Sequence, residues 1–307
     1  MKSEQFIQAL GFYTIYPFLR GVALLPMFLL YRIADIFFLL VLVTGYRKRV
    51  VTDNLKRAFP SASSVEIRKI RMRFYQHFCD LFVETIALQH NPVKRVQKRV
   101  KVINPEVMQK CIEEGKDVVA VLGHYGNWEW VPVASLTFNA LGLSVYRPLK
   151  NPYFDKFMLG LRSGFGSVNV PLKQTAREIV NLKRSNKRFA LGLISDQSPS
   201  KYELHYWTTF LNENTSVILG PEKMARLADA QVVYWQMKKL KRGRYEITFI
   251  PFPGDVKKSA DYEITEWHVR LLERQILDKP EYWLWSHKRW KYQYLYDKNL
   301  HASGSAV

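Results

Sequence analysis

The sequence lacks the motifs that define several common classes of enzyme. It holds two cysteines, Cys79 and Cys111, without the spacing of metal ligands, which argues against a disulfide framework and fits a reducing compartment. It has no Walker loop or G-x-G-x-x-G fingerprint for a nucleotide, no G-x-S-x-G nucleophile elbow and no internal repeat. These absences disfavour a nucleotide-dependent enzyme, a serine hydrolase and a repeat protein.

Acidic residues are scarce relative to basic ones. Lys and Arg total 46 against 27 Asp and Glu, which gives a net charge of +19 over 307 residues. Such a charge implies an acidic partner, either nucleic acid, anionic lipid headgroups or an acidic carrier protein. No helix-turn-helix, RNP, zinc-finger or OB-type motif accompanies it. The basic residues also cluster beside aromatic and apolar ones, at 47–49 and 287–291, as expected at an anionic membrane surface. No nucleic-acid partner is therefore expected.

A long uninterrupted hydrophobic run is also missing. Residues 6–44 are strongly apolar, but the longest clean stretch, 36–44, is far shorter than the roughly 20 residues that span a bilayer core. Pro17 and Pro26 are expected to break any single helix here. If Arg32 and Asp35 pair, residues 21–44 could still cross the membrane or lie deep in one leaflet. A buried helical hairpin is the alternative.

The flanks of this apolar segment indicate its location. No small-residue cleavage site follows it, so a secretory signal peptide is not expected. The basic flank at residues 46–50 is typical of a cytoplasmic membrane boundary. Residues 1–50 are therefore predicted to form a membrane-associating helical segment.

From residue 100 onward the pattern alternates between strands and helices. Such alternation favours one α/β domain, over residues 51–298, with a central mixed, largely parallel sheet flanked by helices. The last residues, 299–307, are expected to be a disordered tail. The expected strands are 100–103, 118–122, 143–146, 188–194, 232–237 and 245–250, the last as an edge strand, and the expected helices are 51–59, 65–89, 105–114, 128–141, 153–164, 174–185, 221–230 and 262–277.

The chemistry is concentrated in the stretch 117–130, DVVAVLGHYGNWEW. His124 follows directly on a strand that is buried on both faces, where open α/β sheets bind ligands. Asn127 offers a helix cap, and Glu129 falls in the first helical turn, where the helix dipole favours a carboxylate. His124 is thus a candidate general base, with Glu129 as the residue that orients its imidazole. A structural histidine beside a surface glutamate remains the alternative from these residues alone.

A metal site is not expected at this histidine. The spacing H-x4-E lacks the H-E-x-x-H arrangement that places ligands on one helical face, and no second histidine or cysteine is near. The sequence predicts neither a metal nor a cofactor.

Several blocks of sequence resemble one known family. GHYGNWEW is similar to the H-x4-D/E box of the lysophospholipid acyltransferase superfamily, and its G-H-x-G-N-W-E form resembles the lipid A late (secondary) acyltransferase branch, the lauroyl and myristoyl transferases. The resemblance covers residues 15–292. The other blocks that carry it are 45–60, 73–84, 145–166, 191–199, 210–225 and 281–291.

The resemblance implies acyl transfer from a thioester to a lipid hydroxyl, without a covalent enzyme intermediate. His124 would deprotonate the acceptor hydroxyl and Glu129 would orient His124. Arg147, at the end of the next strand, would stabilise the oxyanion or bind an acceptor phosphate. Asp196 and Gln197 end another strand and would position the substrate or hold Arg147.

Other polar positions follow from the same resemblance. Asn151 and Arg162 occupy the polar positions of the second conserved block, and Asn127 lies within the box, so all three are expected to contact substrate. The block at 210–220 departs from the usual family pattern, and the aromatic loop at 202–207 is interpreted as a lid or a membrane contact.

The resemblance leaves the substrates open. The leading acceptor is a lipid A precursor, with a glycerolipid, aminolipid or glycolipid as alternatives, and the donor is a thioester of acyl carrier protein or coenzyme A. The expected location is the bacterial inner membrane, with the catalytic domain on the cytoplasmic face. A non-catalytic basic protein that binds membrane or nucleic acid is the alternative of a different class.

Overall fold

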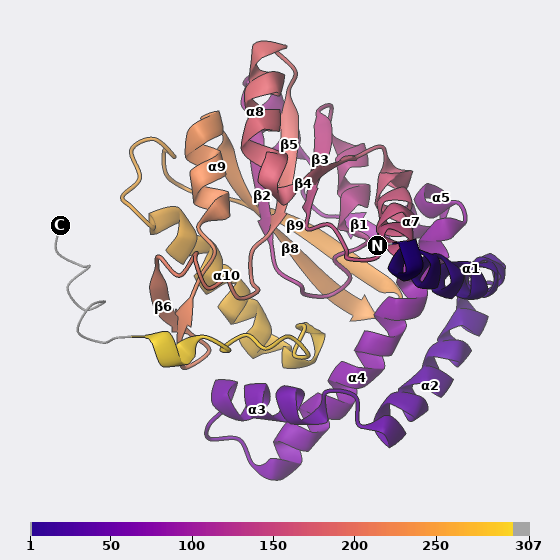
Figure 1. The fold of residues 1–307 in the computed structure, drawn as a ribbon. Coiled ribbons are helices and arrows are strands. Elements are labelled where there is room, and N and C mark those ends of the chain that lie inside the picture. The colour runs from indigo at the N-terminus through magenta and orange to yellow at the C-terminus, as the bar shows by residue number, and fades with distance from the viewer. Residues whose placement is uncertain (1, 297–307) are drawn as a thin grey trace.

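The computed structural model describes residues 2–296 (Figure 1). The expected disordered tail at 299–307 lies outside the described residues. The described chain is an α/β fold in which helices flank a mixed, mostly parallel sheet, as predicted.

The central sheet has seven strands in the order β1-β9-β8-β2-β5-β3-β4. Only the β8–β9 pair is antiparallel, and the other neighbours are parallel. The edge position predicted for the strand at 245–250 is wrong, because β1 pairs with the outer side of β9. The strands are β1 Val100–Val102, β2 Val118–Leu122, β3 Leu141–Tyr146, β4 Val168–Pro171, β5 Phe189–Ile194, β8 Gln231–Lys241 and β9 Arg244–Pro251.

Strand β2 lies at the middle of this sheet, and every one of its residues is buried. It pairs with β5 on one side and β8 on the other, with Leu122 opposite Ile194. The chain segments that follow β2 and β5 therefore leave the sheet side by side. This register places residues just after Leu122 close to residues just after Ile194.

The predicted helices are present with one exception, and one short helix, Pro92–Gln97, was not predicted. The expected helix at 128–141 is instead a 3₁₀ helix, η2, Val131–Thr137, with Pro132 in its first turn. Proline has no N–H, and its ring obstructs an α-helix that continues from the preceding turn. The α-helices after the N-terminal pair are α3 Lys48–Ala58, α4 Ser64–Ile86, α5 Pro92–Gln97, α6 Glu106–Glu113, α7 Pro152–Arg162, α8 Thr175–Arg184, α9 Gly220–Ala228 and α10 Glu263–Asp278.

Two short elements of strand were not predicted. β4 lies at the sheet edge, and a separate antiparallel hairpin pairs β6 Trp207–Phe210 with β7 Glu213–Ser216. All three strands are only four residues long, so they show little hydrophobic period. The hairpin places Thr215 and Ser216 in buried positions near the C-terminal segment.

The N-terminal segment forms two helices, α1 Lys2–Leu24 and α2 Met27–Thr44. The expected break at Pro26 is present, whereas the break expected at Pro17 is wrong, because α1 continues through that residue. A proline there removes one backbone hydrogen bond without ending the helix. Among the described residues, α2 is the one helix long and apolar enough to cross a membrane. It lies alongside α4 (Figure 1).

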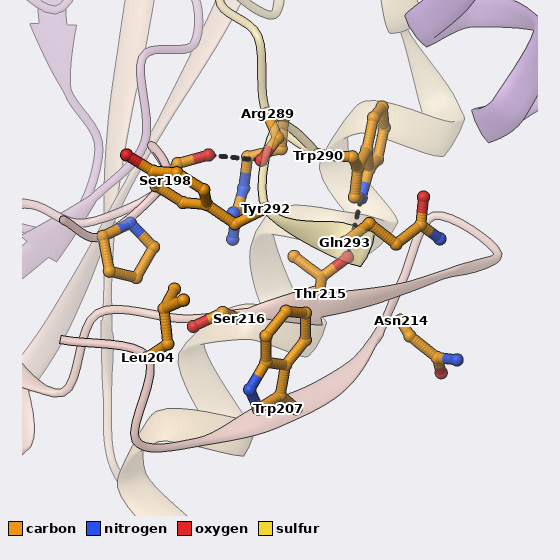
Figure 2. A pocket seen from close by; sticks show the side chains of 11 residues that line it. Ser198, Leu204, Trp207, Asn214, Thr215, Ser216, Arg289, Trp290, Tyr292 and Gln293 are labelled. Atoms are coloured by element: carbon orange, nitrogen blue, oxygen red, sulfur yellow. Dashed lines mark hydrogen bonds between the residues drawn. The ribbon is translucent and has the colours of Figure 1, made fainter. Parts of the chain in front are cut away.

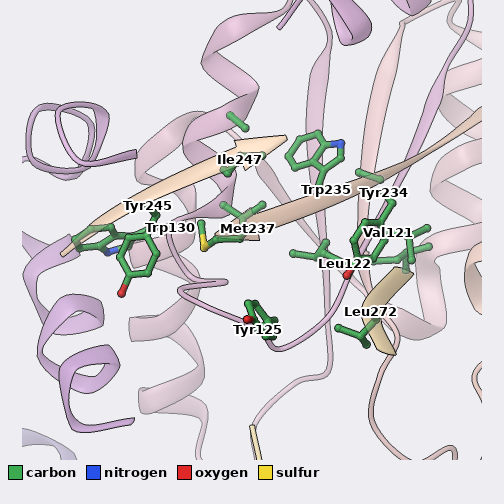
Figure 3. Packing of buried hydrophobic residues seen from close by; sticks show 14 of the residues in the cluster. Val121, Leu122, Tyr125, Trp130, Tyr234, Trp235, Met237, Tyr245, Ile247 and Leu272 are labelled. Atoms are coloured by element: carbon green, nitrogen blue, oxygen red, sulfur yellow. The ribbon is translucent and has the colours of Figure 1, made fainter. Parts of the chain in front are cut away.

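The hydrophobic core continues from the sheet into the loop that follows β2. Figure 3 shows Val121 and Leu122 of β2 near Tyr234 of β8, with Leu272 of α10 close by. A Cβ on Gly123 would lie 2.7 Å from the Leu272 side chain, so a larger residue there would require Leu272 to shift. The core thus fixes the backbone immediately before His124.

Candidate active site

The imidazole of His124 is held by Asp196. Its Nδ1 lies 2.6 Å from Asp196 Oδ1, and the His124 backbone N–H donates to Asp196 Oδ2 at 2.9 Å. The indole of Trp283 donates to the same Oδ2 at 2.6 Å. Because an ionised carboxylate only accepts hydrogen bonds, Nδ1 carries the ring proton and Nε2 is free to accept one. The side chain of His124 is 19% exposed, and it lines a cavity.

The Asp196 carboxylate is buried but ionised. Burial opposes its charged form. The electrostatic attraction of His124 and the hydrogen bonds from the His124 ring, the Trp283 indole and the His124 backbone together outweigh burial. The pKa of Asp196 is thereby lowered to about 2. A permanent negative charge therefore lies against Nδ1 and would stabilise an imidazolium on His124.

Glu129 does not contact the His124 ring as the sequence suggested. Its carboxylate accepts two hydrogen bonds from Arg162, at 2.8 Å from Nε and 2.6 Å from Nη2. Burial opposes the charged form of Arg162, but the bidentate bonds to Glu129 raise its pKa above the ordinary value. The 3₁₀ helix after Trp130 provides a reason, since the first turn of the expected α-helix is absent. Asp196, and not Glu129, thus binds the imidazole of His124, and Glu129 pairs with Arg162.

A cavity of about 500 Å³ opens beside His124. Its walls are mostly apolar, and a few polar groups converge near His124. Gln197 Nε2 lies 3.4 Å from His124 Nε2. Arg147, at the end of β3, is exposed, and it lines the cavity together with Glu129 and Arg162. The apolar residues of the wall include Val131, Phe138, Leu143, Val145, Met158, Leu172, Leu193 and Trp235.

Asn127 supports the loop instead of lining this cavity. It is fully buried, its Nδ2 donates to Glu84 Oε2 at 2.6 Å, and its Oδ1 accepts from the Trp130 backbone at 3.2 Å. Glu84 Oε2 also accepts from Tyr245 at 2.8 Å, and Glu84 Oε1 accepts from Tyr31 of α2 at 2.8 Å. Burial raises the pKa of Glu84. This single side chain connects α2, α4, β9 and the loop that follows His124.

A second buried network lies beside the first. His77 Nε2 lies 3.2 Å from the carbonyl oxygen of Gly126, and Lys239 contacts His77 Nδ1 at 3.0 Å. Lys239 also donates to Asp80, which pairs with Arg242 at 2.6 Å. Burial lowers the pKa of His77, so this imidazole is neutral and its Nδ1 can accept a hydrogen bond from Lys239. The backbone of the box is thus fixed from both sides.

Asn151 is the one expected substrate contact that caps a helix instead. Its Oδ1 accepts from the backbone N–H groups of Tyr153 and Phe154 at 3.0 and 3.3 Å, and its Nδ2 donates to Gln8 of α1 at 3.4 Å. It is absent from the residues of the cavity wall among those described. Asn151 thus starts α7, the helix that carries Arg162.

Two residues that hold the site, Trp283 and Glu84, are not predicted from the sequence: Trp283 donates to Asp196, and Glu84 accepts from Asn127. Trp283 lies in the block 281–291, for which the resemblance implies no residue role. Glu84 had a local signal, since His77, Asp80 and Glu84 recur at helical spacing on one face of α4. Three titratable groups on the buried face of a helix predict a polar network there. In the described part of the chain, no group of three or more His, Cys, Asp or Glu side chains is arranged to hold a metal ion.

The fold and site define a class of enzyme. A histidine at the carboxyl end of a central strand, backed by a carboxylate and open to a long apolar cavity, is suited to proton transfer on a lipid substrate. Residues 2–292 match the family model of bacterial lipid A biosynthesis acyltransferases. The chain belongs to this family and is an acyltransferase.

Relatives support this assignment. The chain is 23% identical over 247 residues to the lipid A biosynthesis lauroyltransferase of Escherichia coli K12, covering 80% of this chain and 79% of that protein. It is also 23% identical over 255 residues to the lipid A biosynthesis palmitoleoyltransferase of the same strain, and to the lipid A biosynthesis acyltransferase of Shigella flexneri, with the same coverage in each case. An acyl donor and a lipid acceptor follow from membership of the family.

Proposed function

We propose that the protein transfers a fatty acyl chain from a thioester to a hydroxyl of a lipid A precursor, with His124 as general base. The observation that carries this proposal is the His124–Asp196 pair, in which Nδ1 is bound to the carboxylate and Nε2, with Gln197 at 3.4 Å, lies beside the cavity. A base must lie within hydrogen-bond reach of the proton that it takes, and Nε2 is the basic atom available to a bound hydroxyl.

The reaction needs one proton transfer in each direction. His124 Nε2 takes the proton of the acceptor hydroxyl as the oxygen attacks the thioester carbonyl carbon. The tetrahedral intermediate collapses, the carbon–sulfur bond breaks, and the imidazolium returns the proton to the leaving thiolate. Asp196 holds the imidazole in the required tautomer and stabilises the imidazolium. Gln197 is displaced from Nε2 by the entering hydroxyl.

The Glu129–Arg162 pair shapes the cavity beside this centre. Two N–H groups of Arg162 donate to the Glu129 carboxylate, which fixes the orientation of both side chains. The carboxylate also neutralises most of the charge of the guanidinium. Arg147 is exposed and lines the cavity, so its positive charge can bind a phosphate of the acceptor or the oxyanion.

The apolar wall of the cavity suits the donor's acyl chain. Burial of hydrocarbon contributes about 0.8 kcal/mol for each methylene group, so a long chain binds such a wall strongly. Phe138 and Trp235, with ring centroids 6.0 Å apart, close part of the wall. The donor is an acyl carrier protein, because the net charge of +19 favours an acidic protein partner.

The exposed apolar face of the N-terminal helices supports a location at the membrane, where the lipid acceptor resides. α2 exposes large apolar side chains, including Phe28, Leu39 and Val43, which is 86% exposed. These side chains are suited to a bilayer, and the basic residues that follow α2 favour its anionic cytoplasmic surface. We place the catalytic domain on the cytoplasmic face of the inner membrane.

The test is acyl transfer by the purified full-length chain in vesicles, with acyl carrier protein thioesters and a lipid A precursor. His124→Ala is expected to lower kcat by about 10²- to 10⁴-fold, the usual contribution of a general base. His205→Ala, which removes an exposed histidine, is the matched control. Wild-type activity in His124→Ala would contradict the mechanism. Transfer to a glycerolipid in place of the lipid A precursor would change the assigned acceptor and leave the base intact.

A further inference from the structure

Arg289 is a buried cation without a counterion. Arg289 is only 4% exposed, and its Nε has no hydrogen-bond partner. Its guanidinium lies 5.8 Å from the ring centroid of Phe210, and no carboxylate of the described residues lies within ion-pair distance. Burial lowers the pKa of Arg289 to about 10, against the opposing charge of Asp196, so the group stays protonated at neutral pH. An unpaired buried charge is costly unless an anion compensates it.

The backbone around Arg289 is held in place by hydrogen bonds. Ser198 donates its hydroxyl proton to the carbonyl oxygen of Arg289, and Trp290 donates its indole N–H to Thr215 at 2.7 Å. Asn54 donates to the carbonyl oxygen of His287 at 2.7 Å. The segment that carries Arg289 is therefore fixed on the sheet side and on the hairpin side, and the guanidinium does not move freely to solvent.

The guanidinium faces a small hollow that contains a second unpaired polar group. Figure 2 shows Arg289 beside Ser198 and Tyr292, with Ser216 across the hollow near Leu204 and with Trp207 further out. Ser216 is 5% exposed, and its hydroxyl has no hydrogen-bond partner. The hollow measures about 10 Å³, which is room for one oxygen-sized group.

This hollow adjoins the reacting cavity. Ser198 lines both spaces, and it directly follows Asp196 and Gln197 in the chain. A molecule that occupies the cavity at His124 can therefore extend a polar group into the hollow. A guanidinium and an unpartnered hydroxyl next to an apolar cavity are suited to bind a phosphate oxygen.

We propose that Arg289 and Ser216 form an anion subsite that binds one oxygen of a phosphate ester on a substrate held at His124. The assignment to a substrate rests on the proposed function, whereas the anion site itself does not. Two substrates carry this chemistry, the phosphorylated headgroup of the acceptor and the phosphopantetheine arm of the donor. The remaining oxygens of the phosphate stay at the open mouth of the hollow.

The first experiment measures anion binding without turnover. Thermal unfolding of the full-length chain in neutral detergent is followed as inorganic phosphate replaces chloride at constant ionic strength. Phosphate is expected to raise the Tm of the wild type and of Lys288→Met, an exposed neighbour that loses the same charge, and to have a smaller effect on Arg289→Met. An equal rise in Tm for Arg289→Met and Lys288→Met would overturn the subsite. This result does not depend on acyl transfer, so it stands even if the proposed function fails.

The second experiment identifies the source of the phosphate. Transfer is measured with acyl-phosphopantetheine against acyl-pantetheine, and with phosphorylated against dephosphorylated glycolipid acceptor. Arg289→Met is expected to raise the KM of the phosphorylated member of one pair roughly 10- to 100-fold, with kcat nearly unchanged, as the loss of a charge-assisted hydrogen bond predicts. The KM of its dephosphorylated partner should not change.

A structural role predicts a different result. If Arg289→Met changes the KM of phosphorylated and dephosphorylated substrates equally, the proposal is overturned. If this variant does not fold, Ser216→Ala provides the test, because its hydroxyl has no partner in the protein to lose. Ser216→Ala is expected to raise the same KM several-fold and to leave the wild-type Tm in chloride unchanged; an unchanged KM would overturn the proposal.

Discussion

Replacing Asp196 by asparagine tests which carboxylate acts on His124, the proposed general base. In the structure Asp196 accepts three hydrogen bonds, two from His124 and one from the indole of Trp283. An asparagine keeps the volume but has one acceptor oxygen and one N–H₂ donor. The amide therefore opposes either the indole N–H or the protonated Nδ1, and the favoured response is a change of tautomer that places the proton on Nε2.

The expected loss follows from this change of tautomer. A base that carries its proton on the reacting nitrogen cannot accept one from the acceptor, and a comparable Asp-to-Asn change in a Ser-His-Asp triad lowers kcat about 10⁴-fold. We expect a decrease of about 10³- to 10⁴-fold for Asp196→Asn. Because residues that act as a unit are not additive, adding Asp196→Asn to His124→Ala should lower the rate little further. Glu129 should instead couple to Arg162, so Glu129→Gln combined with Arg162→Met should regain stability that either change loses alone.

Single-turnover transfer from an acyl thioester, with Tm measured on the same samples, separates these effects. Asp278→Asn, at the exposed end of α10, is the matched control and should behave as the wild type. Wild-type kcat in Asp196→Asn would refute the assignment of this carboxylate. Additive stability losses for Glu129→Gln and Arg162→Met would refute their pairing.

Three further predictions concern stability, chain length and membrane binding. Because burial lowers the pKa of His268 to about 4, only the unfolded chain binds this proton between pH 6.5 and 4, so the free energy of unfolding falls as pH drops through that window; His268→Leu should reduce the slope by about 1.4 kcal/mol per pH unit in denaturant titrations. Phe138→Ala removes a ring from beside Trp235 in the cavity wall and should shift preference toward donors two carbons longer by roughly tenfold in a competition assay, at about 0.8 kcal/mol per methylene; an unchanged product distribution would place the acyl chain elsewhere. Glutamate at both Ile36 and Leu39, exposed positions in the middle of α2, should release the protein from vesicles in flotation, since each charge costs about 3 kcal/mol near a bilayer centre. Full retention would exclude this face of α2 from the membrane.

The sheet could be predicted from the sequence where strands are buried on both faces. β2 and β5 are apolar runs whose length and composition admit few other readings. β4 and the two strands of the β6–β7 hairpin are each only four residues long, so they show too little periodicity to be recognised. The 3₁₀ helix η2 could have been inferred from Pro132, which is incompatible with a continuous α-helix there.

The site was predictable in position but not in pairing. His124 and Asp196 each follow a strand, and both were expected at the same edge of the sheet. That they touch depends on the strand order, in which β5 lies next to β2 although β3 and β4 intervene in the chain. Proximity along the sequence favoured Glu129, and strand order favoured Asp196. Chain order alone does not reveal which strands are neighbours.

The bond from Tyr31 to Glu84 has a practical consequence for handling the protein. A chain shortened to begin after the apolar helices would lose this donor, and Arg242 would lose its contact with Asp35 at 2.7 Å. The loop of the reacting histidine would then rest on a buried carboxylate short of one partner. A detergent-free form is better obtained by replacing the exposed apolar side chains of α2 with polar ones, which leaves the inner face of that helix in place. One face of α2 thus exposes apolar side chains, and another face supports the loop that carries His124.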